Sequence, residues 1–310
     1  MALHGWIILD KPVGLGSTQA VAAVKRLLRE AGEPKTKVGH GGTLDPLASG
    51  VLPIALGEAT KLAGHMLGAT KTYEFTIRFG EETDTLDTEG QAVERSDHRP
   101  TIEDVNAVLP RFTGRIEQVP PAYSALKIGG KPAYQRARAG EELEMKARAV
   151  TVHSLRVSAP PREQDDLTRR RGGAEELETI TVETTVSKGT YIRSLARDLA
   201  RALGTVGHVT MLRRTRAGPF TLEQAISLDF LNQAAKARRL TETVVPLTAA
   251  LDDIPALPVT PGQAQLLRHG QKLAGFPATP GLQLATDEDR PVALVEASAS
   301  GLRVVRGFNL

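Results

Sequence analysis

The chain has 310 residues, 41% hydrophobic and 24% charged, so it can bury the core of one large domain or of two domains. The formal charge of +3 is mildly basic, which permits a nucleic-acid partner but does not demonstrate one. The absence of cysteine excludes disulfides and thiol chemistry, the seven histidines show no metal-ligand spacing, and no apolar run approaches the roughly 18 residues of a membrane span. We therefore expect a cytoplasmic protein with no metal site and no membrane contact.

The N-terminal segment predicts a strand followed by a helix. Residues 6–9 are apolar and end at Lys11-Pro12, after which GLGS forms a turn. Apolar residues then recur at helical spacing; Ser17 or Thr18 can cap this helix and Gly32 can end it.

A glycine-rich stretch, GHGGTLDPLASG, spans residues 39–50 and precedes the apolar run VLPIAL. Proline at position 46 pushes Asp45 into an extended conformation, which fixes how the carboxylate is presented. The glycines allow a backbone or a planar ligand to approach closely, and His40 can stack on a base or donate a hydrogen bond. The alternative is a plain Asp-Pro turn before a strand.

The middle of the chain contains three distinct segments. Residues 71–80 alternate as a strand and residues 101–109 predict a short helix. Residues 124–149 interleave basic residues with glycines, which indicates either an arm over an acidic ligand or a solvated amphipathic helix. Residues 158–178 are almost free of apolar residues and predict a mobile surface loop.

A second strand-to-helix junction follows. Residues 178–187 predict a strand, and a turn leads into a helix that begins near Tyr191 and Arg193 and ends at Gly204. Backbone N–H groups at such a helix start favour anions. A proline-rich stretch near residue 250 then marks a boundary, after which short strands suit a small β-barrel module.

Four of these side chains suit a site for a planar substrate. Arg193 can pair with Asp45 and keep it ionised, while Tyr73 and Tyr191 can present rings and hydroxyls to the same cleft. A tyrosine taken alone is more often a core or surface residue than part of such a site.

Five segments together resemble the TruB-type tRNA pseudouridine synthases of the stand-alone bacterial kind. They follow the family's order and cover nearly the whole chain: LDKPVGLGST, GHGGTLDPLASGVLPIALGEATKL, KTYEFTIRFGEETDTLDTEG, PPAYSALKIGGKPAYQRARAG and VSKGTYIRSLARDLARALG. The tail from about residue 253 resembles the family's PUA-type RNA-binding domain. One departure lies in the glycine-rich stretch but does not touch Asp45, because the family commonly has threonine where this chain has Gly41.

The resemblance implies an α+β fold. A catalytic domain over residues 1–250 would hold a mixed, largely antiparallel sheet flanked by helices, and residues 251–310 would form a PUA-like β-barrel. It implies isomerisation of uridine to pseudouridine at position 55 in the TΨC arm of tRNA, with a flipped-out nucleotide, no cofactor and no metal. A monomer is the family expectation.

The resemblance also assigns roles to residues. Asp45 would be the catalytic aspartate, acting either as a nucleophile or on a ribose proton, and Arg193 would pair with it. Tyr73 would stack on the uracil and help to remove the C5 proton, with Tyr191 in the same pocket. His40 would fill the gap in the RNA stack. The remaining substrate-binding residues would be Lys11 in the Lys-Pro motif and, on the arm, Lys127, Lys131, Arg136 and Arg138.

Two other functions remain open. An RNA-binding or RNA-folding protein without chemistry would explain the basic arm and the barrel, but it has no use for a carboxylate that faces RNA phosphates. A hydrolase with Asp45 as nucleophile would lack the second carboxylate that glycoside hydrolysis usually needs.

Overall fold

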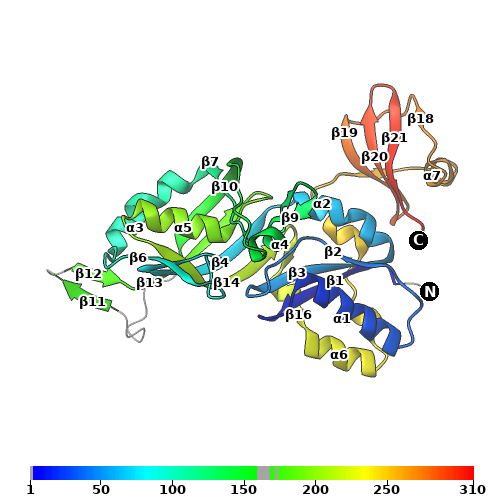
Figure 1. The fold of residues 1–310 in the computed structure, drawn as a ribbon. Coiled ribbons are helices and arrows are strands. Elements are labelled where there is room, and N and C mark those ends of the chain that lie inside the picture. The colour runs from blue at the N-terminus through cyan, green and yellow to red at the C-terminus, as the bar shows by residue number, and fades with distance from the viewer. Residues whose placement is uncertain (1–2, 159–167, 172–173) are drawn as a thin grey trace. The chain divides into compact units, whose positions relative to one another are not determined.

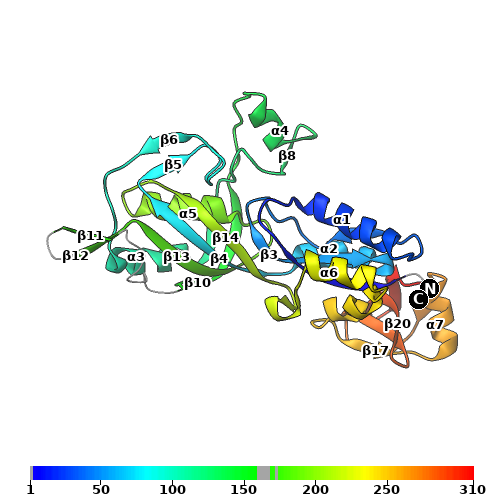
Figure 2. The same cartoon turned by 90° about the horizontal axis from the view of Figure 1, so that it is seen from below.

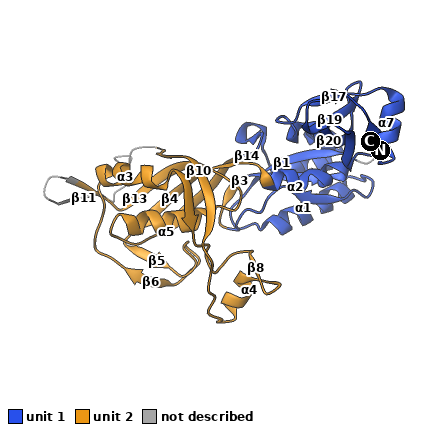
Figure 3. Cartoon of the chain, turned by 90° about the horizontal axis from the view of Figure 1, so that it is seen from above, with its two compact units in different colours: residues 1–46, 50–67, 217–310 blue, residues 47–49, 68–216 orange. Residues whose placement is uncertain are grey.

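The computed structural model describes residues 3–158, 168–171 and 174–310. The chain divides into two compact units (Figure 3). Unit 1 comprises Met1–Pro46, Gly50–Leu67 and Ala217–Leu310, and unit 2 comprises Leu47–Ser49 and Gly68–Arg216. Unit 1 is therefore assembled from segments that lie far apart in the sequence.

Unit 1 is built on a central buried strand, β1 (Gly5–Lys11). This strand pairs antiparallel with β3 (Ser49–Leu56) and parallel with β16 (Ile226–Ser227), while β2 (Val38–His40) pairs antiparallel with β3. Both β1 and β3 are apolar along nearly their whole length, as expected of strands that are covered on both faces. The accompanying helices are α1 (Ser17–Glu30), α2 (Ala63–Gly68) and α6 (Leu228–Lys236) (Figures 1 and 2).

The expected first strand and helix are confirmed, but the expected cap is wrong. The residue that caps α1 is Gly16, whose backbone N–H donates to Oε1 of Gln19 at 2.8 Å. Ser17 does not serve as the cap because its hydroxyl binds the backbone of Leu44 instead. Gly32 follows the helix at φ +77°, which is the conformation of a helix-ending glycine.

The C-terminal part of unit 1 contains a separate five-stranded sheet in the order β17-β19-β20-β21-β18. Helix α7 (Pro261–Arg268) packs on this sheet, and the two share a core of small aliphatic residues. The expected β-rich C-terminal module, of the PUA-like kind, is confirmed; the domain boundary near residue 250 stays a prediction. The strands are β17 (Ala256–Pro258), β18 (Leu273–Ala274), β19 (Gly281–Asp287), β20 (Arg290–Ser298) and β21 (Gly301–Gly307).

Unit 2 contains strands of different lengths that pair largely antiparallel. Its sheet runs in the order β14-β4-β13-β10-β7, and the predicted strands at 71–80 and 178–187 are confirmed as neighbours. The strands are β14 (Gly207–Ala217), β4 (Lys71–Phe79), β13 (Thr179–Val186), β10 (Arg148–Val157) and β7 (Gly114–Gln118).

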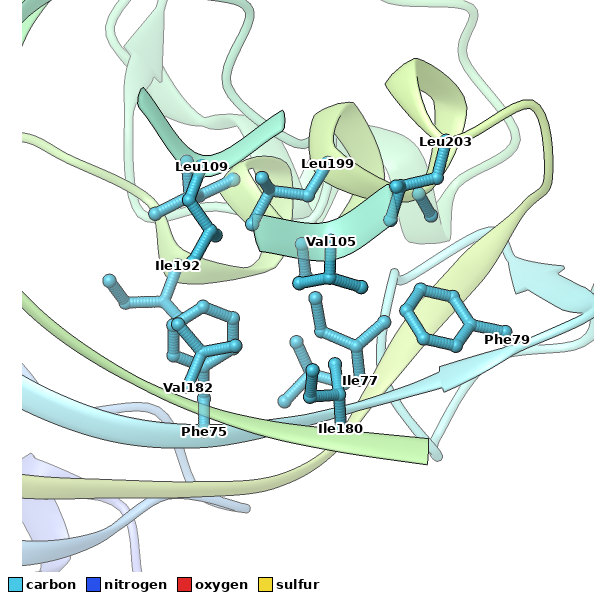
Figure 4. Packing of buried hydrophobic residues seen from close by; sticks show 14 of the residues in the cluster. Phe75, Ile77, Phe79, Val105, Leu109, Ile180, Val182, Ile192, Leu199 and Leu203 are labelled. Carbon is cyan, nitrogen blue, oxygen red and sulfur yellow. The ribbon is translucent and has the colours of Figure 1, made fainter. Parts of the chain in front are cut away.

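The core of unit 2 lies between this sheet and helices α3 (Ile102–Val108) and α5 (Ile192–Ala202) (Figure 4). Alternate residues of β4 and β13 point toward the helices, and the leucines of α5 recur at helical spacing to meet them. The capping box that the sequence predicts at Thr101 is confirmed, because Asp104 N–H donates to Oγ1 of Thr101 at 3.2 Å and the Asp104 carboxylate accepts from Thr101 N–H at 2.9 Å.

Shorter elements connect these frameworks. They are strands β5 (Glu81–Thr83), β6 (Ala92–Arg95), β8 (Lys127–Ile128), β9 (Lys131–Pro132) and β15 (Phe220–Thr221), helix α4 (Ala133–Arg138), and 3-10 turns at Gly57–Leu62, Leu109–Phe112, Leu222–Gln224, Leu240–Thr243 and Leu247–Ala250.

The surface loop expected over residues 158–178 is wrong where the structure describes it. Strands β11 (Thr168–Arg171) and β12 (Ala174–Leu177) pair antiparallel as a two-stranded sheet, with Leu177 N–H donating to the carbonyl of Pro100. Residues 159–167 and 172–173 lie outside the described residues. Over the part of the chain that the structure describes, no helix is long and apolar enough to cross a membrane.

Candidate active site

The loop around Asp45 is held on both sides by buried polar groups of unit 1. On one side, the Ser17 hydroxyl donates to the carbonyl of Leu44 and accepts from its N–H, both at 2.9 Å. On the other side, the carbonyl of Pro46 accepts from Gly14 N–H at 2.8 Å and from the Lys11 ammonium at 3.2 Å. The half-buried carboxylate therefore sits on a backbone segment that is fixed at both neighbours, in the manner needed for a preorganised catalytic group.

Lys11 is entirely buried, which is unusual for a lysine. Its ammonium donates to the carbonyls of Pro12, Leu15 and Pro46 at 2.7–3.2 Å, so the cation ties the turn after β1 to the loop of Asp45. Direct contact with RNA would require Lys11 to leave these partners. Its geometry therefore favours holding the loop over binding a phosphate.

His40 ends β2 opposite Ile54, and the glycine-rich loop begins immediately after it. Gly41 continues the ladder through its N–H, which donates to the carbonyl of Pro53 at 2.8 Å. A Cβ atom on Gly41 would lie 2.9 Å from Cβ of Met66, so the glycine at this position matches the close approach of that side chain. Gly42 has φ +147°, a conformation that side chains other than glycine rarely adopt.

Arg193 lies at the start of α5 in unit 2 and is 6% exposed. Its Nη1 donates to the carbonyl of Thr85 at 2.8 Å and lies 3.3 Å from Oδ2 of Asp87, and its Nη2 donates to the carbonyl of Tyr123 at 3.0 Å. Buried guanidinium groups are stable only with such a set of acceptors. The orientation of Arg193 is thus set by two loops that the sequence analysis did not associate with it.

Asp87 is itself held in place. Its Oδ1 accepts from the Thr85 hydroxyl at 2.6 Å and from Glu89 N–H at 3.1 Å, so the carboxylate faces Arg193 with its other oxygen. The preceding residue, Leu86, has φ +62°, a strained conformation for a branched side chain. The contacts of Thr85 and Asp87 with Arg193, and of Thr85 with Asp87, hold the turn on either side of this strained residue.

Tyr191 is positioned through its backbone by a buried amide. The side chain of Gln118 accepts from Tyr191 N–H at 2.8 Å and donates to the Tyr191 carbonyl at 3.1 Å, which fixes the residue before α5 on the end of β7. Tyr73 lies on β4 opposite Thr184 and packs against the core of unit 2. Unit 2 therefore supplies Tyr73, Tyr191 and Arg193 from its sheet and from the start of one helix.

Lys71 begins β4, two residues before Tyr73, and its side chain is buried in unit 2. Burial, reinforced by the like charges of Arg214 and Lys188, lowers the pKa of Lys71 from 10.5 to about 8. Between these values the unfolded chain binds the proton more tightly than the folded chain does. The free energy of unfolding therefore gains a contribution that rises with pH from about 8 to about 10.5.

Replacing Lys71 with methionine should raise stability at neutral pH. The substitution removes the cost of a buried charge but also the hydrogen bond from Nζ to the Ala69 carbonyl, so we expect a net gain of about 2 kcal/mol near pH 7. Urea unfolding at pH 7 and pH 10 measures it, with the exposed Lys37→Met as control. A variant whose gain is as large at pH 10 as at pH 7 would rule out this electrostatic origin.

The arm at residues 124–149 is a hairpin followed by a short helix, not one amphipathic helix. Strands β8 and β9 pair across Gly129 and Gly130, whose φ angles of +59° and +83° suit a two-residue type I′ turn. Helix α4 then ends before Gly140 at φ +77°. The alternative of one amphipathic helix is wrong because these glycines interrupt it, and the role of the segment as an arm stays a prediction.

The four predicted arm cations differ in their surroundings. Lys127 and Lys131 are exposed beside the hairpin turn. Arg136 forms an ion pair with Glu141 at 2.6 Å, and the guanidinium of Arg138 lies 5.9 Å from the centre of the Tyr134 ring. The lysines are therefore immediately available to phosphates, whereas Arg136 must exchange a carboxylate for a phosphate.

Sequence reasoning overlooked several residues that hold the site, among them Ser17, Asp87, Gln118 and Tyr123. Each acts through a contact with a residue distant in sequence, and each belongs to a common local pattern such as a cap, a turn or a strand end. No group of three or more His, Asp or Glu residues within 3–158, 168–171 and 174–310 is arranged to hold a metal ion.

Comparisons with known proteins decide the family. The N-terminal domain of the TruB family of pseudouridylate synthases matches residues 25–192, more than half of the chain, and the C-terminal domain of tRNA pseudouridylate synthase B matches residues 193–252. The chain belongs to the TruB family. It is thus an enzyme, a tRNA pseudouridine synthase, and the resemblance seen in the sequence is confirmed.

Similar TruB family proteins extend over the full chain. The tRNA pseudouridine synthase B of Zymomonas mobilis is 58% identical over 308 residues, covering 99% of this chain and 97% of that protein. That of Novosphingobium aromaticivorans is 59% identical over 308 residues, covering 99% and 98%. The fold also matches one chain of a solved Cbf5-Nop10-Gar1 complex with a TM-score of 0.69 and 26% sequence identity. The match covers 98% of this chain and 84% of the matched chain. The expected α+β fold is confirmed.

Proposed function

We propose that this TruB family enzyme converts the uridine at position 55 in the TΨC arm of tRNA to pseudouridine, with Asp45 as the catalytic aspartate. The N1–C1′ bond breaks, the uracil turns, the C5–C1′ bond forms, and the C5 proton leaves as N1 gains one. The observation that carries the proposal is the double anchoring of the Asp45 loop by Ser17 and Lys11. A plain surface turn has no need of a buried cation and a buried hydroxyl on either side of one aspartate.

The other residues take roles consistent with their positions. Arg193 is the proposed cationic partner of Asp45, Tyr73 stacks on the uracil and assists loss of the C5 proton, and Tyr191 lines the pocket. His40, which precedes Gly41 and Gly42, replaces the flipped uridine in the RNA stack. Stacking of this kind is worth about 1–3 kcal/mol, which offsets part of the few kcal/mol needed to extrude a base.

Tritium release from tRNA labelled at uridine C5 tests the reaction, and mapping of the new pseudouridine tests the position. One tritium released per tRNA, with the product at a single site in the TΨC arm, supports the proposal. Tight binding of tRNA with no release would instead indicate a binding or folding protein. We propose that the enzyme acts as a monomer in the cytoplasm without a cofactor; light scattering during gel filtration tests the oligomeric state.

Neutralising the arm should weaken the salt dependence of RNA binding. Each phosphate contact contributes about 0.7–0.9 to the slope of log K against log salt, so replacing Lys127, Lys131, Arg136 and Arg138 with glutamine should reduce the slope by about 3. Titrations of tRNA at several salt concentrations measure it. The matched control neutralises four exposed cations outside the arm, Lys25, Arg29, Lys35 and Lys37. An equal loss of slope in that variant would show that net charge, not the arm, is responsible.

A further inference from the structure

Ser124, the first residue of the arm, has a hydroxyl group that its surroundings do not satisfy. The residue is 3% exposed, and its Oγ atom is inaccessible and has no hydrogen-bond partner among the described residues. Such a group costs the folded state about as much as a lost hydrogen bond, and alanine would fill nearly the same space without that cost. A hydroxyl in this position therefore indicates a second state of the enzyme in which it has a partner.

The backbone at Ser124 is connected directly to the proposed catalytic arginine. Ser124 N–H donates to the carbonyl of Ala122 at 3.0 Å, which makes a tight turn centred on Tyr123. The Tyr123 carbonyl accepts from Nη2 of Arg193 at 3.0 Å. That carbonyl shares one rigid peptide plane with the Ser124 N–H, so any rotation at Ser124 re-aims an acceptor of the guanidinium.

The same residue is connected to the arm on its other side. The carbonyl of Ser124 accepts from the backbone N–H of Tyr134 at 3.0 Å, and the carbonyl of Leu126 accepts from Ala133 N–H at 2.6 Å. Both donors lie at the start of α4, whose last turn carries Arg136 and Arg138. RNA bound to these cations can thus act through α4 on Ser124 by the hydrogen bond from Tyr134, and on Leu126, two residues further on, by the bond from Ala133.

We propose that Tyr123 and Ser124 couple the docking of RNA on the arm to the placement of the Arg193 guanidinium, and that the Ser124 hydroxyl gains an oxygen acceptor in the RNA-bound enzyme. Ser124 is a positioning residue, because it acts through Arg193 and not on the uridine. The inference rests on the role proposed above for Arg193. It explains why an uncompensated hydroxyl stands next to the carbonyl of Tyr123, where the start of the arm adjoins an acceptor of the arginine.

Deleting the hydroxyl should then affect the free protein and the reaction in opposite directions. Ser124→Ala should raise the melting temperature of the free protein, leave the Kd for tRNA within about twofold, and lower the single-turnover rate of tritium release about tenfold, as expected for one lost hydrogen bond. Ser124→Cys, which keeps the size but donates weakly, should lose rate in the same way. It serves as the second variant if the alanine variant folds poorly.

Thr205→Val is the matched control. Thr205 is 4% exposed, and its hydroxyl donates to the carbonyl of His98 at 2.9 Å, away from the arm. This variant should lower the melting temperature and leave the rate unchanged. Full activity in both Ser124 variants beside an active wild type would overturn the coupling alone, as would a joint fall in stability and rate. A wild type that releases no tritium would instead overturn the proposed function.

Discussion

Replacement of Asp45 by asparagine is expected to abolish pseudouridine formation while tRNA binding persists. Both candidate roles, attack on C1′ and removal of a ribose proton, need an ionised carboxylate, and an amide supplies neither. We expect the single-turnover rate to fall by about 10³-fold or more. Because Leu44 and Pro46 are anchored through their backbones, the variant should keep its fold and a Kd for tRNA within about threefold.

Tritium release and filter binding on the same protein sample measure both quantities. Asp97→Asn, at an exposed aspartate of unit 2, is the matched control and should behave as the wild type. If Asp45→Asn releases tritium at the wild-type rate, the enzyme stands but Asp45 is not at its centre. If binding is lost together with the rate, the loop serves primarily to bind RNA.

The second large effect is expected from breaking the buried ion pair in unit 2. Replacing Arg193 with methionine leaves Asp87 buried without its cation, and also removes donors from the carbonyls of Thr85 and Tyr123. Removal of one partner of a buried pair typically costs about 3–5 kcal/mol, so the free energy of unfolding should fall by that amount. The rate should fall too, because the proposed partner of Asp45 is gone.

A double-mutant cycle separates these two consequences. Asp87→Asn in the Arg193→Met background should restore about 1–2 kcal/mol of stability, since no uncompensated carboxylate remains, but should restore no activity. Urea unfolding and single-turnover assays measure the two quantities. Purely additive losses of stability would show that Arg193 and Asp87 do not form an energetically significant pair. Recovery of activity would show that the arginine acts only to neutralise Asp87.

Several supports of the site bind backbone atoms and not the proposed catalytic side chains. The ammonium of Lys11 and the hydroxyl of Ser17 fix the loop of Asp45, and Gln118 fixes Tyr191, through bonds to backbone atoms. These anchors bind backbone atoms of Leu44 and Pro46, so a substitution of the Asp45 side chain leaves them in place.

Elements with strong hydrophobic periodicity could be predicted from the amino-acid sequence. The alternation of β4 and β13 and the leucine spacing of α5 predicted strands and a helix correctly, since burial on one face imposes a period that can be read without coordinates. The family resemblance likewise followed from contiguous motifs, each within a single segment.

The contacts that support the candidate residues join segments distant in sequence, so they are visible only in the folded chain. Ser17 was expected to cap a helix, but its hydroxyl binds the backbone of Leu44, 27 residues away. Lys11 was expected to bind RNA, but it is buried and donates to three backbone carbonyls. The pairing of β11 with β12 was missed because a polar segment carries no hydrophobic period. Local sequence patterns show which residues are apolar. A buried hydrogen bond joins a donor and an acceptor that the fold brings together, and the spacing of residues within one segment does not predict such a pair.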